Sequence, residues 1–203
     1  YLHGLVRDND RQKMSKSKGN AIDPLGVAEL YGADALRMAL VAGNTPGNDI
    51  IISEEKIRGY RNFANKIWNV SRFVLLNKLS RISADNKHGL TRKLTANDKK
   101  ILKELKNLTK KITELIDNFK LYAAAEKLYR YFWHVFADKI IEQAKPRLVG
   151  NNEKDKQAAR YLLKEILETN LKLLHPFMPF LTEKIWQEMK NKNCLMIEKW
   201  PGF

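Results

Sequence analysis

Apolar positions recur every three or four residues over most of the chain after residue 52, which is the spacing of amphipathic helices. Ser53, followed by two glutamates, is a strong helix start, and this helix is expected to run to about residue 79. Its predicted buried stripe is Tyr60, Phe63, Ile67, Val70 and Val74. Residues 80–94 lack this period, so a loop is expected there.

A second long helix is predicted to open at Thr95, because Asp98 three residues later completes the pattern of a capping box. The segment Asn118–Lys120 interrupts the apolar period and is expected to end this helix. Lysines cover its remaining faces, which makes its outer surface strongly basic. The predicted buried stripe is Ile101, Leu105, Leu108, Ile112 and Leu115.

Three further helices are predicted after residue 120. The first starts at Leu121 and is expected to stop at Pro146, since proline cannot donate the helical hydrogen bond. Residues 147–154 are then expected to form a loop. The next helix covers about residues 156–174. Pro179 stands at the start of the last helix, where a missing N–H costs nothing.

The first 52 residues follow a different pattern of short elements. Residues 1–12 read as the end of a strand and a turn, and residues 50–52 form a brief extended piece. Two short helices are expected between them. Asp23 caps the first, which Gly32 ends, and the second covers about residues 33–42.

These elements predict a mostly α protein: a small α/β region over residues 1–52, then an antiparallel helical bundle over residues 53–203. The chain has 203 residues, of which 44% are apolar and 30% charged, enough for a real core. No apolar run approaches the ~20 residues of a membrane span, and the start lacks the features of a signal peptide. The single cysteine, Cys194, excludes a disulfide framework, so a cytoplasmic setting is expected.

The positive charge is regional. Residues 1–60 hold eight basic and eight acidic side chains, whereas residues 61–203 hold 29 basic and 15 acidic ones. The whole net charge of +14 therefore lies in the predicted bundle. Such an excess suits a nucleic-acid backbone, although a lysine-rich, solvated helix surface would give the same count.

One polar stretch, Lys13–Asn20, carries the most distinctive chemistry. It places three lysines and two serines within six residues and ends in Gly-Asn, with no apolar period. This composition predicts a mobile cationic loop that can hold a polyphosphate. The chain contains no GxxxxGK[ST] pattern, so lysine side chains rather than a glycine-rich backbone would bind the phosphates. Lysines in an exposed basic linker are the alternative.

The stretch resembles the Lys-Met-Ser-Lys-Ser signature of class I aminoacyl-tRNA synthetases, and its Gly-Asn is usual in the subgroup for branched aliphatic amino acids and methionine. The resemblance extends over nearly the whole chain, in the order seen in the valyl-tRNA synthetase family. Leucyl- and isoleucyl-tRNA synthetases are the alternative within the class. The segments that carry it are residues 1–7, 22–24, 31–37, 45–49, 61–69, 144–148 and 174–180.

This resemblance implies a role in the ATP-dependent activation of valine and its transfer to tRNA. Lys16 is the expected ATP contact, and Lys13 assists it in stabilising charge on the pyrophosphate leaving group. Met14, Ser15 and Ser17 complete the expected ATP-binding loop. ATP would bring Mg²⁺ with it in the complete enzyme, and no metal site of the chain itself is expected.

The chain has no His-x-Gly-His box, which the class carries in its nucleotide-binding sheet. His3-Gly4 does not replace that box. Because the first residue is also not methionine, we expect the chain to be a C-terminal fragment of a longer protein. Alone, it is expected neither to activate valine nor to charge tRNA.

The resemblance also implies tRNA binding, with contacts to the inner corner and to the anticodon stem-loop. Arg72 and Phe73 are the preferred candidates, because a cation beside an aromatic ring can hold a phosphate and stack a base. Phe73 could instead belong to the core, since it lies next to Val74. Arg58 and Arg61 are further candidates for phosphate contact, with a solvated surface as their alternative.

Other residues are assigned structural roles. Trp68, Trp133 and Trp186 are expected in the core, and His134 and His175 have no second ligand at metal spacing. The lysine-rich face between Lys99 and Lys111 is expected to give general attraction or solvation rather than base readout. A non-enzymatic RNA-binding helical bundle is the alternative from another functional class.

Overall fold

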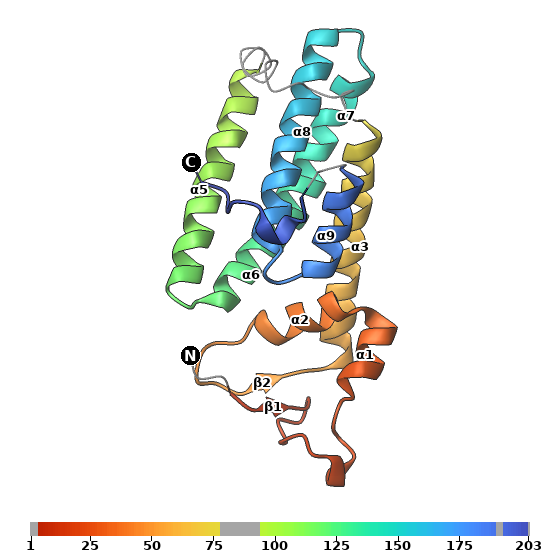
Figure 1. The fold of residues 1–203 in the computed structure, drawn as a ribbon, viewed down its shortest axis with the longest axis vertical. Coiled ribbons are helices and arrows are strands. Elements are labelled where there is room, and N and C mark those ends of the chain that lie inside the picture. The colour runs from red at the N-terminus through yellow and green to blue at the C-terminus, as the bar shows by residue number, and fades with distance from the viewer. Residues whose placement is uncertain (1–3, 78–93, 190–192, 203) are drawn as a thin grey trace.

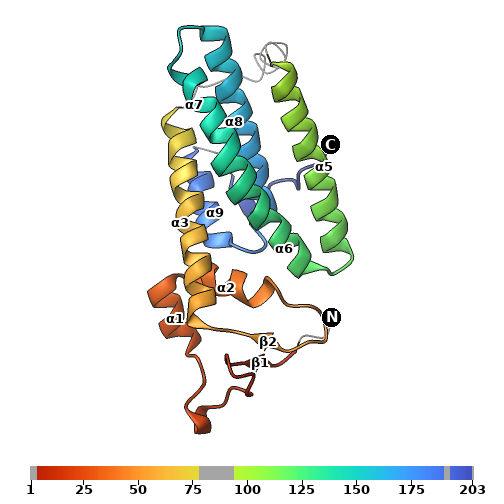
Figure 2. The same cartoon turned by 180° about the vertical axis from the view of Figure 1, so that it is seen from behind.

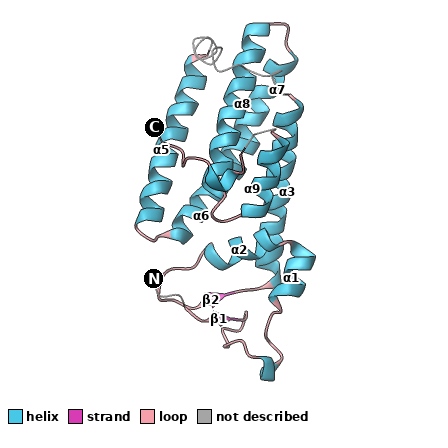
Figure 3. Cartoon of the chain, in the orientation of Figure 1, coloured by secondary structure: helices cyan, strands magenta, loops and turns pink. Residues whose placement is uncertain are grey.

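A computed structural model describes residues 4–77, 94–189 and 193–202 of the chain. The molecule is elongated (Figures 1 and 2), with a small unit of short elements at one end and a bundle of long helices above it. Helices dominate the described residues, and the strands are confined to the small unit (Figure 3). The expected fold class, a helical bundle preceded by a small α/β region, is therefore confirmed.

The small unit is built around two short parallel strands, β1 (Val6–Arg7) and β2 (Ile50–Ile51). Helices α1 (Pro24–Tyr31) and α2 (Ala33–Val41) lie between them in the chain, where two short helices were predicted. Asp23 caps α1 by accepting hydrogen bonds from two backbone N–H groups of its first turn. The buried members of its apolar cluster are Ala35, Ala39, Ile52 and Ile57, whereas Met38 and Ala42 belong to the main core.

Helix α3 (Glu54–Leu76) joins the small unit to the bundle. Its first turn contributes Ile57 to the small core, and its later turns contribute Phe63 and Ile67 to the main core. Ser53 caps it as predicted, with its hydroxyl accepting a 3.1 Å hydrogen bond from the Lys56 backbone N–H. The long helix therefore fixes one unit relative to the other.

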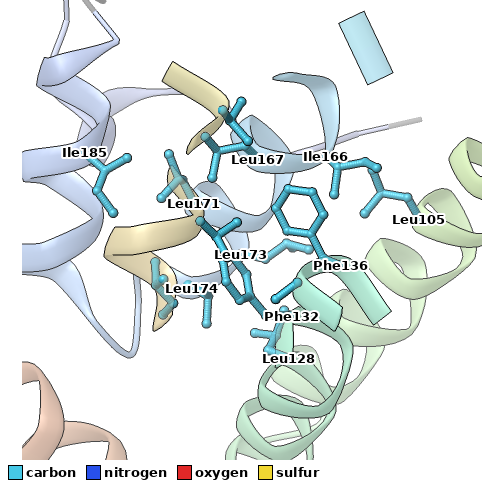
Figure 4. Packing of buried hydrophobic residues seen from close by; sticks show 14 of the residues in the cluster. Leu105, Leu128, Phe132, Phe136, Ile166, Leu167, Leu171, Leu173, Leu174 and Ile185 are labelled. Carbon is cyan, nitrogen blue, oxygen red and sulfur yellow. The ribbon is translucent and has the colours of Figure 1, made fainter. Parts of the chain in front are cut away.

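The rest of the bundle follows in the chain. Thr95 and Asp98 form the predicted capping box at the start of α5, with each side chain accepting a hydrogen bond from the other residue's backbone N–H. Figure 4 shows the core where side chains of these helices meet. The elements are α5 (Ala96–Asp117), α6 (Leu121–Arg130), η3 (Tyr131–Ile140), α7 (Ile141–Val149), α8 (Glu153–Leu174), α9 (Pro179–Glu188) and the short turn η4 (Leu195–Ile197).

The helix predicted from Leu121 is one continuous run whose middle part, η3, has the wider π-helical turn. Phe132 and Phe136 lie on this part and are fully buried. The apolar period alone did not indicate this change of winding, because both helix types keep these aromatic side chains on one face.

The predicted stop at Pro146 is wrong. The helix continues through Pro146 to Val149, and α8 begins at Glu153, capped by the Asn152 side chain. Contacts beyond the proline explain this: the Arg147 guanidinium binds the Asp98 carboxylate at 2.7 and 2.9 Å, and Leu148 is buried. These tertiary contacts outweigh the local preference of proline.

The expected loop over residues 80–94 lies almost wholly outside the described residues. Helix α3 is described to Leu76, close to its predicted end. Within the described ranges, no helix is both long enough and apolar enough to cross a membrane.

Candidate functional site

The basic loop folds into a short turn at the end of the small unit that points away from the bundle (Figures 1 and 2). Lys16–Lys18 form the 3₁₀ turn η1, and the Ser15 hydroxyl accepts a hydrogen bond from the Lys18 backbone N–H. Gly19 follows with φ at +68°, a left-handed conformation that glycine adopts without strain. The turn therefore has its own capping residues at both ends.

Asn20 holds the two sides of this loop together. Its side-chain oxygen accepts a 2.9 Å hydrogen bond from the Ser15 backbone N–H, and its amide donates to the Asp8 carboxylate at 2.8 Å. This bond from Asn20 is the main reason that the pKa of Asp8 is lowered. Sequence reasoning gave Asn20 no role, because both partners lie on the other side of the turn, five and twelve residues earlier in the chain.

The loop has one apolar side chain that packs against the small core and several lysines that are exposed to solvent. Met14 is half-buried and packs against the small core, while Lys13, Lys16 and Lys18 are exposed. The Lys13 backbone also forms an isolated antiparallel bridge with Arg7, the last residue of strand β1. The arrangement presents several ammonium groups to solvent from a fastened backbone, which suits contact with an anionic ligand.

Arg58 and Arg61 lie one turn apart in the first half of α3, and both are exposed. Residues three apart on a helix share a face, so both guanidinium groups can meet the same extended anion. Nearby, the Tyr31 hydroxyl donates a hydrogen bond to the Glu54 carboxylate, which ties α1 to the start of α3.

Arg72 and Phe73 occupy different environments near the other end of α3. Arg72 is exposed, whereas Phe73 is half-buried and packs against the main core. Adjacent residues on a helix point in directions about 100° apart, so the two side chains do not form one surface. Instead, Arg72 lines a groove together with Trp68, one turn earlier.

Trp68 is thus only partly the core residue that the sequence predicted. It is half-buried, packing against the main core while also lining the groove. Trp186 is buried, as expected. Trp133 is half-buried, with its ring near-parallel to that of Phe63 at a centroid separation of 6.1 Å. Sequence spacing could have paired Trp68 with Arg72, since they stand four residues apart.

The loop and the Arg72 groove are separate sites. Arg72 stands 18 residues beyond the start of α3 at Glu54, which is about 27 Å at 1.5 Å per residue. The loop lies farther away still, at the end of the small unit opposite the bundle (Figure 1). No small ligand could contact Lys16 and Arg72 together, whereas an extended polyanion could reach both.

The outer face of α5 adds a band of positive charge to the bundle. Its members are exposed: Lys99, Lys100, Lys103, Lys106, Lys110 and Lys111. One of them, Lys111, forms an ion pair with Glu114 at 3.1 Å. Among the described residues, no three His, Cys, Asp or Glu side chains gather into a group that could hold a metal ion.

Two family patterns match the chain. Residues 98–202 match the family described as the anticodon-binding domain of tRNA ligase, and residues 1–53 match the family described as class I tRNA synthetases (I, L, M and V). The first match covers more than half of the chain.

Curated relatives and solved structures agree with these matches. The chain is 44% identical over its full length to the valine–tRNA ligase of Clostridium acetobutylicum, and 48% identical over 99% of its length to that of Geobacter sulfurreducens. It spans 23% of the length of each relative. Its fold is similar to part of a LeuRS–tRNA–LeuAMS complex from Agrobacterium radiobacter K84, with a TM-score of 0.76 and 23% identity over 99% of this chain and 23% of that one. It is also similar to Mycobacterium tuberculosis methionyl-tRNA synthetase bound by methionyl-adenylate, with a TM-score of 0.72 and 22% identity over 91% of this chain and 36% of that one.

Proposed function

Because the chain belongs to the family of tRNA ligases that carry this anticodon-binding domain, we propose that it is part of a valine–tRNA ligase. Residues 1–52 would supply the end of the catalytic domain with its ATP loop, and residues 53–203 would supply the anticodon-binding bundle. The observation that carries the proposal is the fastened loop with exposed lysines, in a chain 44–48% identical to these valine–tRNA ligases.

The first half of the proposed function is contact with ATP. Lys13 and Lys16 would bind the phosphates and stabilise the negative charge that builds on the departing pyrophosphate. Their exposure and the absence of a glycine-rich phosphate loop support this role. Met14, Ser15 and Ser17 would hold the loop backbone in place, Met14 by its contact with the small core. Mg²⁺ would enter with ATP, and the chain's own contribution is the lysine side chains.

The second half is contact with tRNA along α3. Arg58 and Arg61 would meet the inner corner of the tRNA, and Arg72 with the exposed part of Phe73 would meet the anticodon stem-loop. Arg58 and Arg72 stand 14 residues apart, about 21 Å along this helix, which suits a long polyanion. The location of the whole net charge of +14 beyond residue 60 supports the same partner.

Two alternatives make different predictions. A leucyl- or isoleucyl-tRNA synthetase segment would share the loop and the bundle but select another tRNA. A non-enzymatic RNA-binding bundle would not depend on Lys16 for any reaction step. The identity to valine–tRNA ligases over the whole chain favours a valine–tRNA ligase over both of these alternatives. A cytoplasmic setting remains a prediction.

The loop can be tested in a chimera in which this chain replaces the matching segment of the Clostridium acetobutylicum enzyme. Lys16→Ala is expected to slow valine-dependent ATP–pyrophosphate exchange by about 10²–10³-fold, the scale of a lost transition-state donor. Binding of tRNA should change little. Lys154→Ala, an exposed lysine at the start of α8, serves as the charge-matched control. Unchanged exchange after Lys16→Ala would contradict the assignment, as would exchange catalysed by the isolated chain.

A further inference from the structure

A second groove lies on the bundle between α5 and the continuous helix formed by α6 and η3 (Figure 2). Its volume is about 540 Å³, compared with about 320 Å³ for the groove beside Arg72. Helices α3 and α5 lie on opposite sides of the bundle in both views (Figures 1 and 2). A ligand that follows the outer face of α3 therefore leaves this second groove uncovered.

The floor of the groove is apolar. Leu108 lines it from α5, and Ala123 and Val135 line it from the opposite helix. All three side chains are half-buried, so a partner that covers them removes further apolar surface from water. The lining also recurs at i, i+4, i+7 and i+11 from Ala123 to His134, which is one helix face about 16 Å long. That length matches about three turns of a second helix.

The rim of the groove carries positive charge. Lys127 and Arg130 stand one turn apart on α6, are exposed, and form no ion pair with any described residue. His134 adds a cation when it is protonated, with its Nδ1 atom 3.6 Å from the Asp138 carboxylate. Glu126 also lines the groove, but its charge is engaged by Lys56 of α3, whose charged form it favours. Two cations are therefore left to meet acidic groups of a partner.

Tyr131 adds a hydrogen-bond donor where the winding of the helix changes. It lines the groove as the first residue of η3, and π-helical turns are rare and frequent at functional sites. Its hydroxyl oxygen is buried and has no hydrogen-bond partner among the described residues. Burial, with the charge of Glu104 as a smaller cause, raises the pKa of Tyr131, so the hydroxyl keeps its proton. Such a donor suits a ligand that brings an acceptor oxygen.

We propose that this groove is the docking site for an acidic amphipathic helix of a partner protein. The apolar stripe of that helix covers Leu108, Ala123 and Val135, as in other complexes that seat a helix in a groove. Its carboxylates bind Lys127 and Arg130 on the rim, where opposite charge speeds association and fixes the register. The inference goes beyond the proposed function and does not depend on it.

Two other occupants fit the groove less well. A second copy of this chain carries the same net charge of +14, so two copies repel each other. RNA would be attracted by Lys127 and Arg130, but the aliphatic floor favours apolar side chains over bases, which stack on aromatic rings. The proposed tRNA contacts also belong to α3, across the bundle (Figure 1). We therefore expect the partner helix and tRNA to bind at the same time.

The probe is a labelled helical peptide of about 16 residues, with leucines along one face and glutamates beside them. Fluorescence anisotropy with the 203-residue chain gives its affinity at fixed salt. One control peptide has the same composition in scrambled order, and another has lysines in place of the glutamates. We expect the acidic amphipathic peptide to bind at least tenfold more tightly than either control.

Three variants separate the contributions of the groove. Ala123→Arg places a long side chain over the floor and should lower the affinity at least tenfold. Lys127→Glu combined with Arg130→Glu should lower it at least tenfold for the acidic peptide and raise it for the lysine peptide. Tyr131→Phe removes only the hydroxyl and should lower the affinity about threefold.

Matched controls keep the test specific. Lys154→Glu and Arg72→Glu reverse exposed charges outside this groove, and each should leave the affinity for the acidic peptide within about twofold. Circular dichroism of every variant establishes that loss of binding is not loss of fold.

The proposal is overturned if the scrambled peptide binds as well as the acidic one, or if Ala123→Arg leaves the affinity unchanged. Displacement of the peptide by an RNA hexamer would assign the groove to RNA. A dimer in sedimentation velocity that Ala123→Arg abolishes would assign it to a second copy of the chain. A tRNA(Val) transcript added to the same samples separates this inference from the proposed function. A preference for tRNA(Val) without peptide binding rejects the docking site alone, and peptide binding with equal affinity for all tRNAs rejects the proposed function alone.

Discussion

The carboxylate of Asp34, in helix α2 of the small unit, accepts a 2.6 Å hydrogen bond from the backbone N–H of Leu181, 147 residues further along the chain. It also accepts a 3.3 Å bond from the Phe180 N–H. These N–H groups belong to the first turn of α9, where Met178 provides no side-chain cap. A residue of the small unit therefore caps a helix of the bundle.

Asp34→Ala should remove this cap and lower the free energy of unfolding by about 1–2 kcal/mol, the usual cost of losing a cap residue. Asp34→Asn keeps an acceptor oxygen and should cost less. Urea unfolding monitored by circular dichroism measures both variants. Asp23→Ala, which removes the local cap of α1, is the matched control, because its effect is confined to one short exposed helix. Wild-type stability of Asp34→Ala would show that the bond contributes nothing.

The same residue predicts a dependence on pH. Burial raises the pKa of Asp34 above its ordinary value of 3.8, and the N–H groups of Leu181 and Phe180 offset only part of this effect. As pH rises above 3.8, the unfolded chain therefore releases the Asp34 proton before the folded chain does, which lowers stability. The stability of the wild type relative to Asp34→Asn should fall as pH rises from 3.8 through the folded pKa. A relative stability that rises over this window would reverse the assignment.

Arg147 should be among the most sensitive positions in the bundle. Its guanidinium binds Asp98, whose side chain is fully buried, and also Asp155 at 2.9 Å. Burial alone would raise the pKa of Asp98, but its bonds to Arg147 and Thr95 outweigh this effect and lower the pKa. Arg147→Met leaves that buried carboxylate unpaired and should cost about 3 kcal/mol or more in urea unfolding.

An exposed ion pair provides the comparison for Arg147. Lys145 binds Glu142 at 2.7 Å, and both side chains are about half exposed. Lys145→Met should change the unfolding free energy by less than about 1 kcal/mol. If Arg147→Met is equally mild, the buried pair does not hold the end of α7 in place.

Pro146 offers a direct test of the helix end. Because α7 continues to Val149, proline sits inside a helix and cannot donate to the carbonyl of Glu142. Pro146→Ala should therefore raise the free energy of unfolding by about 1–2 kcal/mol, after allowing for the freer unfolded chain. If Pro146 instead ended the helix, as its position in the sequence suggested, alanine would be neutral or destabilising.

Asn20→Ala should loosen the basic loop without affecting the bundle. It removes the bonds to the Ser15 backbone and to Asp8 that close the loop. Hydrogen exchange at the backbone N–H groups of Ser15 and Lys18 should accelerate, while exchange in α5 stays unchanged. Asn77→Ala, which removes a side-chain bond to the Phe73 carbonyl at the end of α3, is a matched control outside the loop. Unaltered exchange at Ser15 would mean that Asn20 does not organise the loop.

The sequence predicted what is decided locally. Ser53 and the Thr95–Asp98 box cap their helices as expected, because the partners lie within three residues. The continuation through Pro146 depends on Asp98, which is 49 residues from Arg147, and the cap of α9 depends on Asp34. Such contacts follow from tertiary packing, which an apolar period does not describe.

The candidate site divides in the same way. The loop could be recognised from its lysines and serines, because its chemistry is contiguous in the chain. Trp68 and Arg72 line one groove only because Ile185 and Glu188 of α9 lie against α3. The packed bundle, not the sequence, establishes this neighbourhood. The roles of Lys16 in catalysis and of Arg72 in RNA binding stay predictions until they are measured.

We propose that this chain binds the tRNA for valine through its anticodon. The most direct measurement is the affinity of the 203-residue chain for a tRNA(Val) transcript, for the same transcript with a substituted anticodon, and for a leucine-accepting tRNA, all at one salt concentration. We predict that tRNA(Val) binds most tightly and that anticodon substitution weakens binding at least tenfold. Equal affinity for all three transcripts would overturn this proposal, because it would reduce the bundle to a general cationic surface.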